Sequence, residues 1–336
     1  MMKDEYLLAI ESSCDETACA ILKKGTELLA NIVSSQINVH QKFGGVVPEV
    51  ASRLHVENIS YVISQALEKA GIQPRDLSAV CYTKGPGLVG CLQVGVLGAK
   101  TLAYVNDLPL VPVHHLAGHI YANEYIAPLE FPLLALVVSG GHTELVHMPA
   151  DYVFEPIGST GDDAIGEAYD KVARVLGLPY PGGPAIDKLA KQGQPVYALP
   201  KVHPAGEYNF SFSGLKSAVI QSQARIIRQG KEMNKADMAA SFQEAALQEI
   251  MQRVHNALEH FQPKHFVVAG GVAANSRLRE LITKEMEKHP EISYTLPPIW
   301  CCTDNAAMIA KAGYHAYHKG IRANYDDNAD PSYELY

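Results

Sequence analysis

The stretch YLLAIESSCDET at residues 6–17 and the stretch LLALVVSGGHT at residues 133–143 repeat one pattern. In each, an apolar run of strand type leads into a short polar turn with serine near its start and threonine at its end. A second apolar run, typical of a return strand, follows at 18–22 and at 144–148. Because this strand–turn–strand unit occurs twice, the sequence predicts two homologous lobes.

A third stretch, HFVVAGGVAAN at 265–275, joins a short strand to a Gly270-Gly271 turn, and a helix is predicted after it at 276–288. Glycine lets the backbone approach a ligand closely, and the N-terminus of a helix favours negative charge. The alternative is that each of the three turns needs its small residues only for a tight backbone. Taken together, the three loops favour a nucleotide site.

Helical spacing of apolar residues predicts further helices between the strands. They are placed at 55–69, 164–176, 235–261 and 305–318, with Asp162 as a candidate N-cap of the second. Strands that alternate with helices indicate an α/β fold with mixed sheets. We expect one lobe from residues 1–120 joined by the C-terminal segment 305–336, a second lobe from residues 121–304, and a nucleotide cleft between them.

The composition limits the class of protein. The chain has 336 residues, of which 47% are hydrophobic, and this is enough to bury the cores of two domains. No apolar run reaches about 18 residues and the start lacks a signal-peptide pattern, so we expect a cytoplasmic protein that does not enter a membrane. The six cysteines form no C-x-x-C pair, which argues against a disulfide framework or a zinc ribbon.

Two histidines stand at a metal-binding spacing. His115 and His119 follow a predicted strand at 111–114, and on a helix two side chains four residues apart lie on one face. Neutral imidazole suits zinc, iron and nickel. The alternative is an accidental pair in a chain with 14 histidines. Zinc peptidases of the H-E-x-x-H type need a glutamate directly after the first histidine, where this chain has Leu116, so a peptidase is disfavoured.

Asp304 is a candidate for the third metal ligand, because the segment CCTDN at 301–305 opens the last predicted helix. Aspartate is also a favourable N-cap at such a place. The spacing leaves both roles open.

Seven motifs follow one another along the chain. They are ESSCDET at 11–17, the pair His115 and His119, VSGGHT at 138–143, DDxxGExxDK at 162–171, YPGGP at 180–184, SFSGLK at 211–216 and GGVAAN at 270–275. With these motifs in order, the chain resembles the tRNA N6-adenosine threonylcarbamoyltransferase family, formerly labelled O-sialoglycoprotein endopeptidase. The match runs from about residue 6 to residue 315, and the C-terminal tail lies outside it.

The resemblance implies both a fold and a reaction. The implied fold is that of the actin-like, sugar-kinase-like and chaperone-ATPase-like proteins, with two lobes around a nucleotide cleft. In the implied reaction, threonylcarbamoyl-AMP gives its threonylcarbamoyl group to the N6 amine of adenosine 37 in tRNAs that read codons beginning with A. AMP leaves.

The resemblance also implies ligands for particular residues of this chain. His115, His119 and Asp304 would hold one divalent metal, Fe²⁺ in the first place and Zn²⁺ as the alternative. The residues that would meet the phosphate are Val137, Val138, Ser139, Gly140 and Gly141. Those that would meet the nucleoside and acyl parts are Asp170, Gly183, Asp187 and Asn275.

Asp15 and Glu16 in the first loop are the candidate catalytic residues. We hypothesise that Asp15 takes a proton from the attacking amine or orients it, since it lies in the loop expected to face the cleft. The alternative is that Asp15 orders the turn or binds water near the metal.

The net charge of −8 does not favour tight tRNA binding by this chain alone. Basic candidates for contact with tRNA exist, although solvated helix faces explain most of them equally simply: Lys188, Lys191, Arg225, Arg228, Lys231 and Lys235. The resemblance implies that partners help to hold tRNA, namely an inactive paralogue of the same fold and a small ATPase, as in a bacterial-type complex.

Two other functions compete with the transferase. One is an H-x-x-x-H metallopeptidase, which here lacks the glutamate. The other is an actin-like, nucleotide-dependent ATPase or scaffold. Proteins of that class usually hold Mg²⁺ through phosphates and carboxylates, so the histidine pair argues against it.

Overall fold

The structure, a computed structural model, describes residues 4–200 and 206–335. The chain divides into two compact units, each built on a sheet of its own. Unit 1 comprises Met1–Leu129 and Thr303–Tyr336, and unit 2 comprises Glu130–Cys302. The C-terminal segment therefore rejoins unit 1 just before Asp304, which places Asp304 in the same unit as the two histidines.

Unit 1 is built on a five-stranded mixed sheet. In chain order its strands are β1 (Tyr6–Glu11), β2 (Glu16–Lys23), β3 (Glu27–Ser35), β4 (Ala79–Gly85) and β5 (Leu110–His114). Their order across the sheet is β3-β2-β1-β4-β5. β1, β2 and β3 are antiparallel neighbours, whereas β4 and β5 run parallel to β1. The carboxyl ends of β1, β4 and β5 therefore meet at one edge of the sheet.

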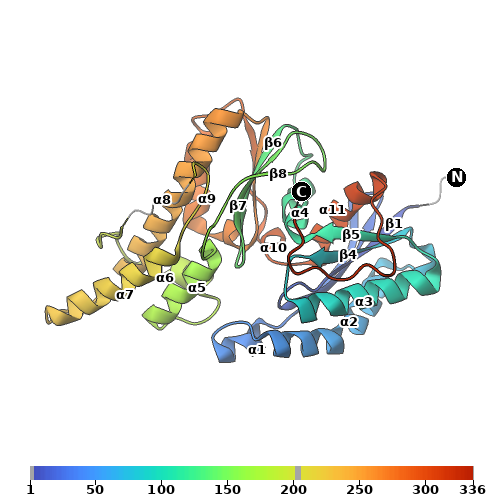
Figure 1. The fold of residues 1–336 in the computed structure, drawn as a ribbon, viewed down its shortest axis with the longest axis horizontal. Helices are drawn as coiled ribbons and strands as arrows, with labels where there is room; N and C mark the ends of the chain where they lie inside the picture. Colours follow the sequence, from blue (N-terminus) through green and yellow to red (C-terminus); the bar gives the residue numbers. More distant parts are fainter. Residues whose placement is uncertain (1–3, 201–205, 336) are drawn as a thin grey trace. The chain divides into compact units, whose positions relative to one another are not determined.

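Helices cover both faces of this sheet. α2 (Pro48–Ala70) and α3 (Val89–Asn106) pack on one face, and α4 (His115–Tyr121) and α11 (Ala306–His318) pack on the other (Figure 1). α11 comes close to the sheet because its inward residues are small. A Cβ added at Gly313 would lie 2.5 Å from the Sγ of Cys81 in β4. The short helices of this unit are α1 (Ile37–His40), η1 (Gln41–Phe43), η2 (Pro74–Asp76) and η3 (Ala122–Tyr125).

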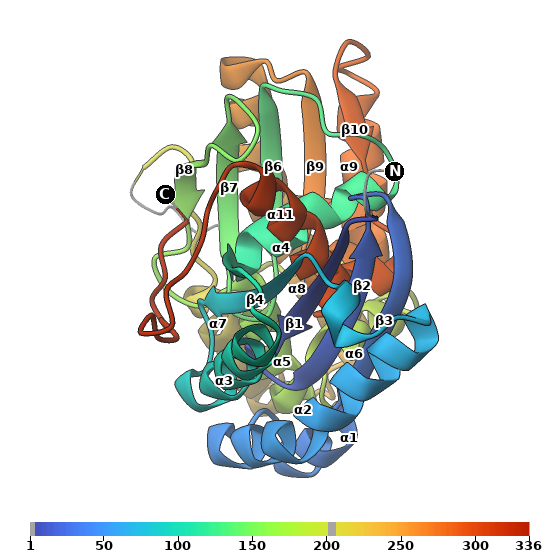
Figure 2. The ribbon, with the colours of Figure 1, turned by 90° about the vertical axis from the view of Figure 1, so that its right-hand side faces the viewer.

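Unit 2 repeats the arrangement of unit 1. Its strands are β6 (Leu133–Val138), β7 (Thr143–Met148), β8 (Glu155–Ser159), β9 (His265–Ala269) and β10 (Ser293–Thr295). Their order is β10-β9-β6-β7-β8, and Figure 2 shows β8, β7, β6 and β9 next to one another. The hairpin strands are antiparallel and the two later strands run parallel to β6. Strand by strand, this is the topology of unit 1, as the repeated hairpin predicted.

The helices of unit 2 pack around one large apolar core, which includes Leu136 and Val138 of β6 and Phe266 and Val268 of β9. The helices are α5 (Ile165–Leu176), α6 (Gly182–Ala190), α7 (Ser213–Arg228), α8 (Lys235–Phe261), η4 (Gly271–Ala274), α9 (Ser276–Met286) and α10 (Ile299–Cys302). The predicted helix at 235–261 is confirmed at both ends. The helix predicted from residue 55 begins earlier, at Pro48.

One predicted cap is wrong. Asp162 does not cap α5, whose N-cap residue is Ala164. The Asp162 carboxylate instead accepts hydrogen bonds from the hydroxyls of Ser211 and Ser213 and from the backbone N–H of Phe212. A carboxylate that can satisfy three donors of a distant loop is held by that loop rather than by the nearby helix end.

All six cysteines are free thiols, and all but Cys14 are buried, as small apolar residues would be. No helix within residues 4–200 and 206–335 is long and apolar enough to cross a membrane.

Candidate functional site

The two histidines of the H-x-x-x-H pair lie at the edge of the unit 1 sheet where β5 ends. α4 begins at His115, directly after the strand, and the His114 side chain caps it by accepting a hydrogen bond from the Leu116 N–H. Both rings of the pair are buried, and their centroids lie 4.7 Å apart. The predicted juxtaposition of the two imidazoles on one helix face is therefore present.

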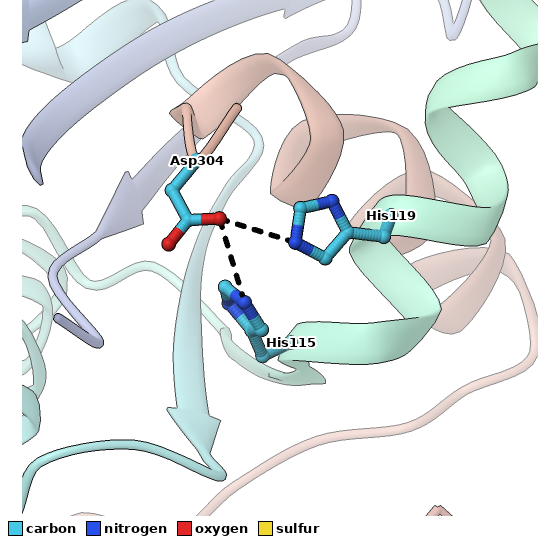
Figure 3. A group of neighbouring side chains, drawn as sticks. All are labelled: His115, His119 and Asp304. Atoms are coloured by element: carbon cyan, nitrogen blue, oxygen red, sulfur yellow. Dashed lines mark ion pairs between the residues drawn. The ribbon is translucent and has the colours of Figure 1, made fainter. Parts of the chain in front are cut away.

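Asp304 points at both histidines (Figure 3). Its Oδ1 lies 3.1 Å from Nε2 of His119 and 3.6 Å from Nε2 of His115. The cap of α11 is the neighbouring residue, Asn305, whose side chain accepts a hydrogen bond from the Met308 N–H. The capping alternative for Asp304 is therefore wrong, and its carboxylate is directed to the histidines.

The geometry of these three side chains fits a metal ion. Two ligands of a tetrahedral zinc or iron centre lie about 3.3 Å apart when each is about 2.0–2.1 Å from the metal. The two distances from Asp304 bracket this value. His119 is buried, and among the described residues neither of its ring nitrogens has a hydrogen-bond partner, although Nε2 lies so near Asp304. A buried imidazole without hydrogen bonds is costly unless it binds something else.

Glu11, at the end of β1, contacts the ring nitrogen of His115 that does not face Asp304. Its Oε2 lies 3.1 Å from Nδ1 of His115, and the same carboxylate accepts hydrogen bonds from the Ser13 N–H and the Thr83 hydroxyl. This fixes Nε2 of His115 as the nitrogen that faces Asp304. Glu11 is the first residue of the ESSCDET motif, but no local pattern in the sequence predicts its contact with His115.

Replacement of Glu11 by glutamine is expected to weaken metal binding by roughly 10–100-fold, because the carboxylate orients His115 and makes it a better ligand. The fold should persist, since glutamine has the same size and can still accept the Thr83 hydrogen bond. Competition with a chelator measures the affinity. Serine at position 35, whose hydroxyl binds Glu16 in the same unit, offers a control: Ser35→Ala should leave the affinity unchanged. Equal affinities for Glu11→Gln and the parent would contradict the role of Glu11.

The charge balance at the site makes metal binding depend on pH. Burial by itself would lower the pKa of His115, but the Asp304 and Glu11 carboxylates outweigh burial and raise that pKa to about 9. Metal-free protein therefore carries a proton on His115 at pH 7, and a metal ion must displace it.

The apparent zinc affinity should consequently rise about tenfold per pH unit from pH 7 and level off above about pH 9. Chelator competition at pH 7, 8 and 9 measures this slope. An affinity that does not change over this range would show that His115 binds the metal without losing a proton.

The two candidate catalytic carboxyls lie in the turn between β1 and β2. Asp15 is buried, and its backbone carbonyl accepts a hydrogen bond from the Gln36 N–H. The Glu16 carboxyl accepts a hydrogen bond from the Ser35 hydroxyl. Burial raises the pKa of Glu16 to about 10, and the neighbouring Asp15 and Asp304 contribute to the rise. At neutral pH Glu16 therefore carries a proton and can donate one.

In unit 2, the predicted phosphate loop lies between β6 and β7. Val137 and Val138 are buried in β6. Ser139 closes the turn with two hydrogen bonds: its N–H donates to the His142 carbonyl, and its hydroxyl oxygen accepts from the His142 N–H. Gly140 and Gly141 are open, because a Cβ added at either would meet no atom within 4 Å. The two glycines thus leave room for a ligand against the backbone.

The remaining predicted nucleotide residues lie around the starts of α6 and α9 in unit 2. The Asp170 carboxylate accepts a hydrogen bond from the Gly182 N–H at 2.6 Å, next to Gly183. Asp187 of α6 accepts a hydrogen bond from Ser276, the first residue of α9. Asn275 caps α9 and donates to Gln243 of α8. Asp187 and Asn275 are therefore brought to one helix start.

The sequence matches one protein family over most of its length. The model of the tRNA N6-adenosine threonylcarbamoyltransferase family matches residues 27–311. A tRNA N6-adenosine threonylcarbamoyltransferase of Bacillus subtilis (strain 168) is 54% identical over 334 residues, which are 99% of this chain and 96% of that protein. One of Geobacillus kaustophilus (strain HTA426) is 53% identical over 336 residues, 100% of this chain and 98% of that protein.

Among solved structures, the HypF protein of T. kodakarensis is similar with a TM-score of 0.63 and 16% sequence identity, over 95% of this chain and 48% of that one. At this identity the likeness concerns the fold. Together with the two sheets of equal topology, it confirms the predicted α/β fold of the actin-like class.

Proposed function

The chain belongs to the tRNA N6-adenosine threonylcarbamoyltransferase family, and we propose that it transfers the threonylcarbamoyl group of threonylcarbamoyl-AMP to the N6 amine of adenosine 37 in tRNAs that read codons beginning with A. It is a transferase that acts in tRNA modification. The single structural observation that carries the proposal is the group of the buried His115 and His119 with the half-buried Asp304, since it offers a metal site of transition-metal type in a member of this family.

The chemistry needs little more than positioning and charge stabilisation. The adenine amine is a weak nucleophile, whereas the mixed anhydride of a carbamic acid and a phosphate is a good electrophile. The nitrogen attacks the carbamoyl carbon, the bond from that carbon to the phosphate oxygen breaks, and AMP leaves with the electron pair. Preorganised donors near the phosphate stabilise the developing charge. Adenosine 37 lies in the anticodon loop, where a base can be turned out of the stack.

Fe²⁺ is the metal we propose for the site in unit 1, with Zn²⁺ as the alternative. Two imidazole nitrogens and one carboxylate oxygen suit either ion and are a poor set for Mg²⁺. When bound, the metal would polarise a carbonyl oxygen or neutralise phosphate charge. Glu11 holds one of these ligands, His115, in place.

We propose that the nucleotide binds to the groups of unit 2 described above. The open backbone at Gly140 and Gly141 would receive the phosphate, and Asp170, Gly183, Asp187 and Asn275 would receive the nucleoside and acyl parts. The supporting observations are the room beside Gly140, Gly141 and Gly183 and the convergence of Asp187 and Asn275 on one helix start.

Asp15 is the residue we propose as proton acceptor for the attacking amine. Glu16 is unsuited to accept a proton at neutral pH because its raised pKa keeps it protonated. We expect Asp15→Asn to lower the transfer rate by roughly 10²–10⁴-fold, which is the usual contribution of a general base. Single-turnover transfer with preformed threonylcarbamoyl-AMP measures the rate. A variant with full activity and intact metal content would leave Asp15 only a role in ordering the turn.

Partners and location follow the family. We propose that an inactive paralogue of the same fold and a small ATPase help this chain to bind tRNA. We also propose that the protein works in the cytoplasm. The net charge of −8 supports a need for partners. On α3, the apolar side chains Val89, Leu97 and Tyr104 are more than half exposed at spacings of eight and seven residues. They form an apolar stripe that suits contact with a protein of the same fold.

The decisive test is a transfer assay. The chain, alone and with the same-fold paralogue and the small ATPase, is incubated with threonylcarbamoyl-AMP and unmodified tRNA, and the nucleosides are analysed by mass spectrometry. We expect threonylcarbamoyladenosine and AMP in equal amounts. Absence of both products in every combination would refute the transferase, and cleavage of a protein substrate by the purified chain would favour the peptidase instead.

A further inference from the structure

Unit 2 contains a second group of metal-type ligands, at the opposite end of α9 from Asn275. His255 comes from α8, Glu285 from the last turn of α9, and His289 from the turn that follows. One possible ligand atom of each lies within 4.8 Å of those of the others. None of the three belongs to the motifs from which the function was inferred.

The distances within this group are close to those of a metal centre. The Glu285 Oε1 lies 2.7 Å from Nδ1 of His255 and 3.6 Å from Nε2 of His289. Ligands of a tetrahedral zinc ion lie about 3.3 Å apart. The three candidate ligand atoms lie within 4.8 Å of one another, so adjustment of the side chains would place them around one ion.

The side chain of His289 gives the strongest evidence that this group binds an ion. Only 8% of its side chain is exposed, yet its Nε2 has no hydrogen-bond partner among the described residues. The nearest acceptors to Nε2 are the Oε1 atoms of Glu285, at 3.6 Å, and Glu259, at 3.8 Å. A buried ring nitrogen that lies near a carboxylate without a hydrogen bond is also found at His119 in unit 1.

The surrounding charges favour a cation. Three carboxylates, those of Glu259, Glu285 and Glu291, lie within 4 Å of the His289 ring nitrogens. Lys288 binds Oε2 of Glu285, whereas the histidines face Oε1. The Lys288 side chain is 63% exposed and can remain on Oε2 or turn to water. Glu291 lies 3.7 Å from Nδ1 of His289, where carboxylates commonly orient a metal-bound histidine.

We propose that His255, Glu285 and His289 form a second, structural zinc site, with Glu259 as the fourth ligand. Two imidazoles with carboxylates match the preferences of zinc. The ion would tie the end of α8 to the end of α9 and fix the turn that leads into β10. The role is structural because four protein groups would complete the coordination and leave no place for a substrate.

The test separates the two sites by removing the first. In the full chain with His115→Ala and His119→Ala, we expect one zinc ion per chain after dialysis against trace zinc, measured by element analysis. Adding His289→Ala should lower the zinc affinity by roughly 100-fold or more. Adding His260→Ala, on α8 but outside the group, should not lower it. Cobalt bound in place of zinc should show the visible absorption of a tetrahedral site in the background variant and with His260→Ala added, but not with His289→Ala added.

Glu285→Gln provides a second variant in case His289→Ala unfolds the region, since it keeps the shape and removes the charge. It should also lower the zinc affinity, and zinc should raise the melting temperature of the background variant but not of this one. No retained zinc in the background variant, or retained zinc that neither His289→Ala nor Glu285→Gln reduces, would overturn the proposal.

Discussion

Replacing His119 by alanine is expected to remove the metal from unit 1 and to lower the transfer rate by at least roughly 100-fold. A second-sphere residue alone contributes about 10–100-fold to metal affinity, and a direct ligand contributes more. His119 is buried and its Nε2 lies 3.1 Å from Asp304, so the change removes one of the three side chains that would hold the metal. Element analysis measures the metal, and single-turnover transfer measures the rate.

His318→Ala is the matched control for this change. His318 lies in the same unit on α11, with half of its side chain exposed, and it contacts Glu5 away from Asp304. The control should keep both the metal and the activity. Loss of metal in His119→Ala without loss of activity would show that the transfer reaction does not need the metal. Full metal content in a folded His119→Ala protein would disprove the ligand assignment itself.

Replacing Gly270 by alanine is expected to destabilise unit 2 by at least about 2 kcal/mol. Gly270 has φ of 90° and ψ of 170°, a region that is essentially restricted to glycine and that costs another residue about 1–3 kcal/mol. An added Cβ would also lie 2.4 Å from the carbonyl oxygen of Val138. That atom belongs to the backbone of β6, which is paired with β9, so relief of the clash would move the sheet and cost about 1–3 kcal/mol more.

Gly271→Ala is the control at the next position, because a Cβ there would meet no atom within 4 Å. Its effect on stability should stay within about 0.5 kcal/mol. Denaturant unfolding of both variants measures the difference. Since Gly270 lies against the end of β6 beside Ser139, its variant should also lose binding of AMP. Equal stabilities of the two variants would show that the strands can separate at Gly270 without cost.

The helices and strands that could be predicted are those with a clear local pattern of apolar residues. Those that could not be predicted form because of their packing in three dimensions. β1 and β6 are continuous apolar runs, and α8 has an unbroken helical period. α3 gave no such signal because it contains Gly90, Gly95 and Gly98, which disfavour helix. These glycines are needed in three dimensions: a Cβ at Gly95 would lie 2.3 Å from the Ser12 hydroxyl oxygen.

The metal group was predictable only in part for the same reason. Spacing within one helix pointed to His115 and His119, because four residues of helix determine which side chains share a face. It could not decide the role of Asp304, since both Asp304 and Asn305 are good caps and only the three-dimensional structure shows which one binds Met308. Glu11 reaches His115 across 104 residues of sequence, a contact that no local pattern reveals.

Two sheets with the same strand order give the chain an internal repeat at the level of topology. β5 is followed by α4 with His115 and His119, whereas β10, its counterpart in unit 2, is followed by Ile299–Cys302 without a histidine. β4 leads through Gly87 into α3, and β9 leads through Gly270 and Gly271 towards α9. The two units thus share a scaffold and differ at one corresponding strand end, which carries the paired imidazoles in unit 1 and Ile299–Cys302 in unit 2.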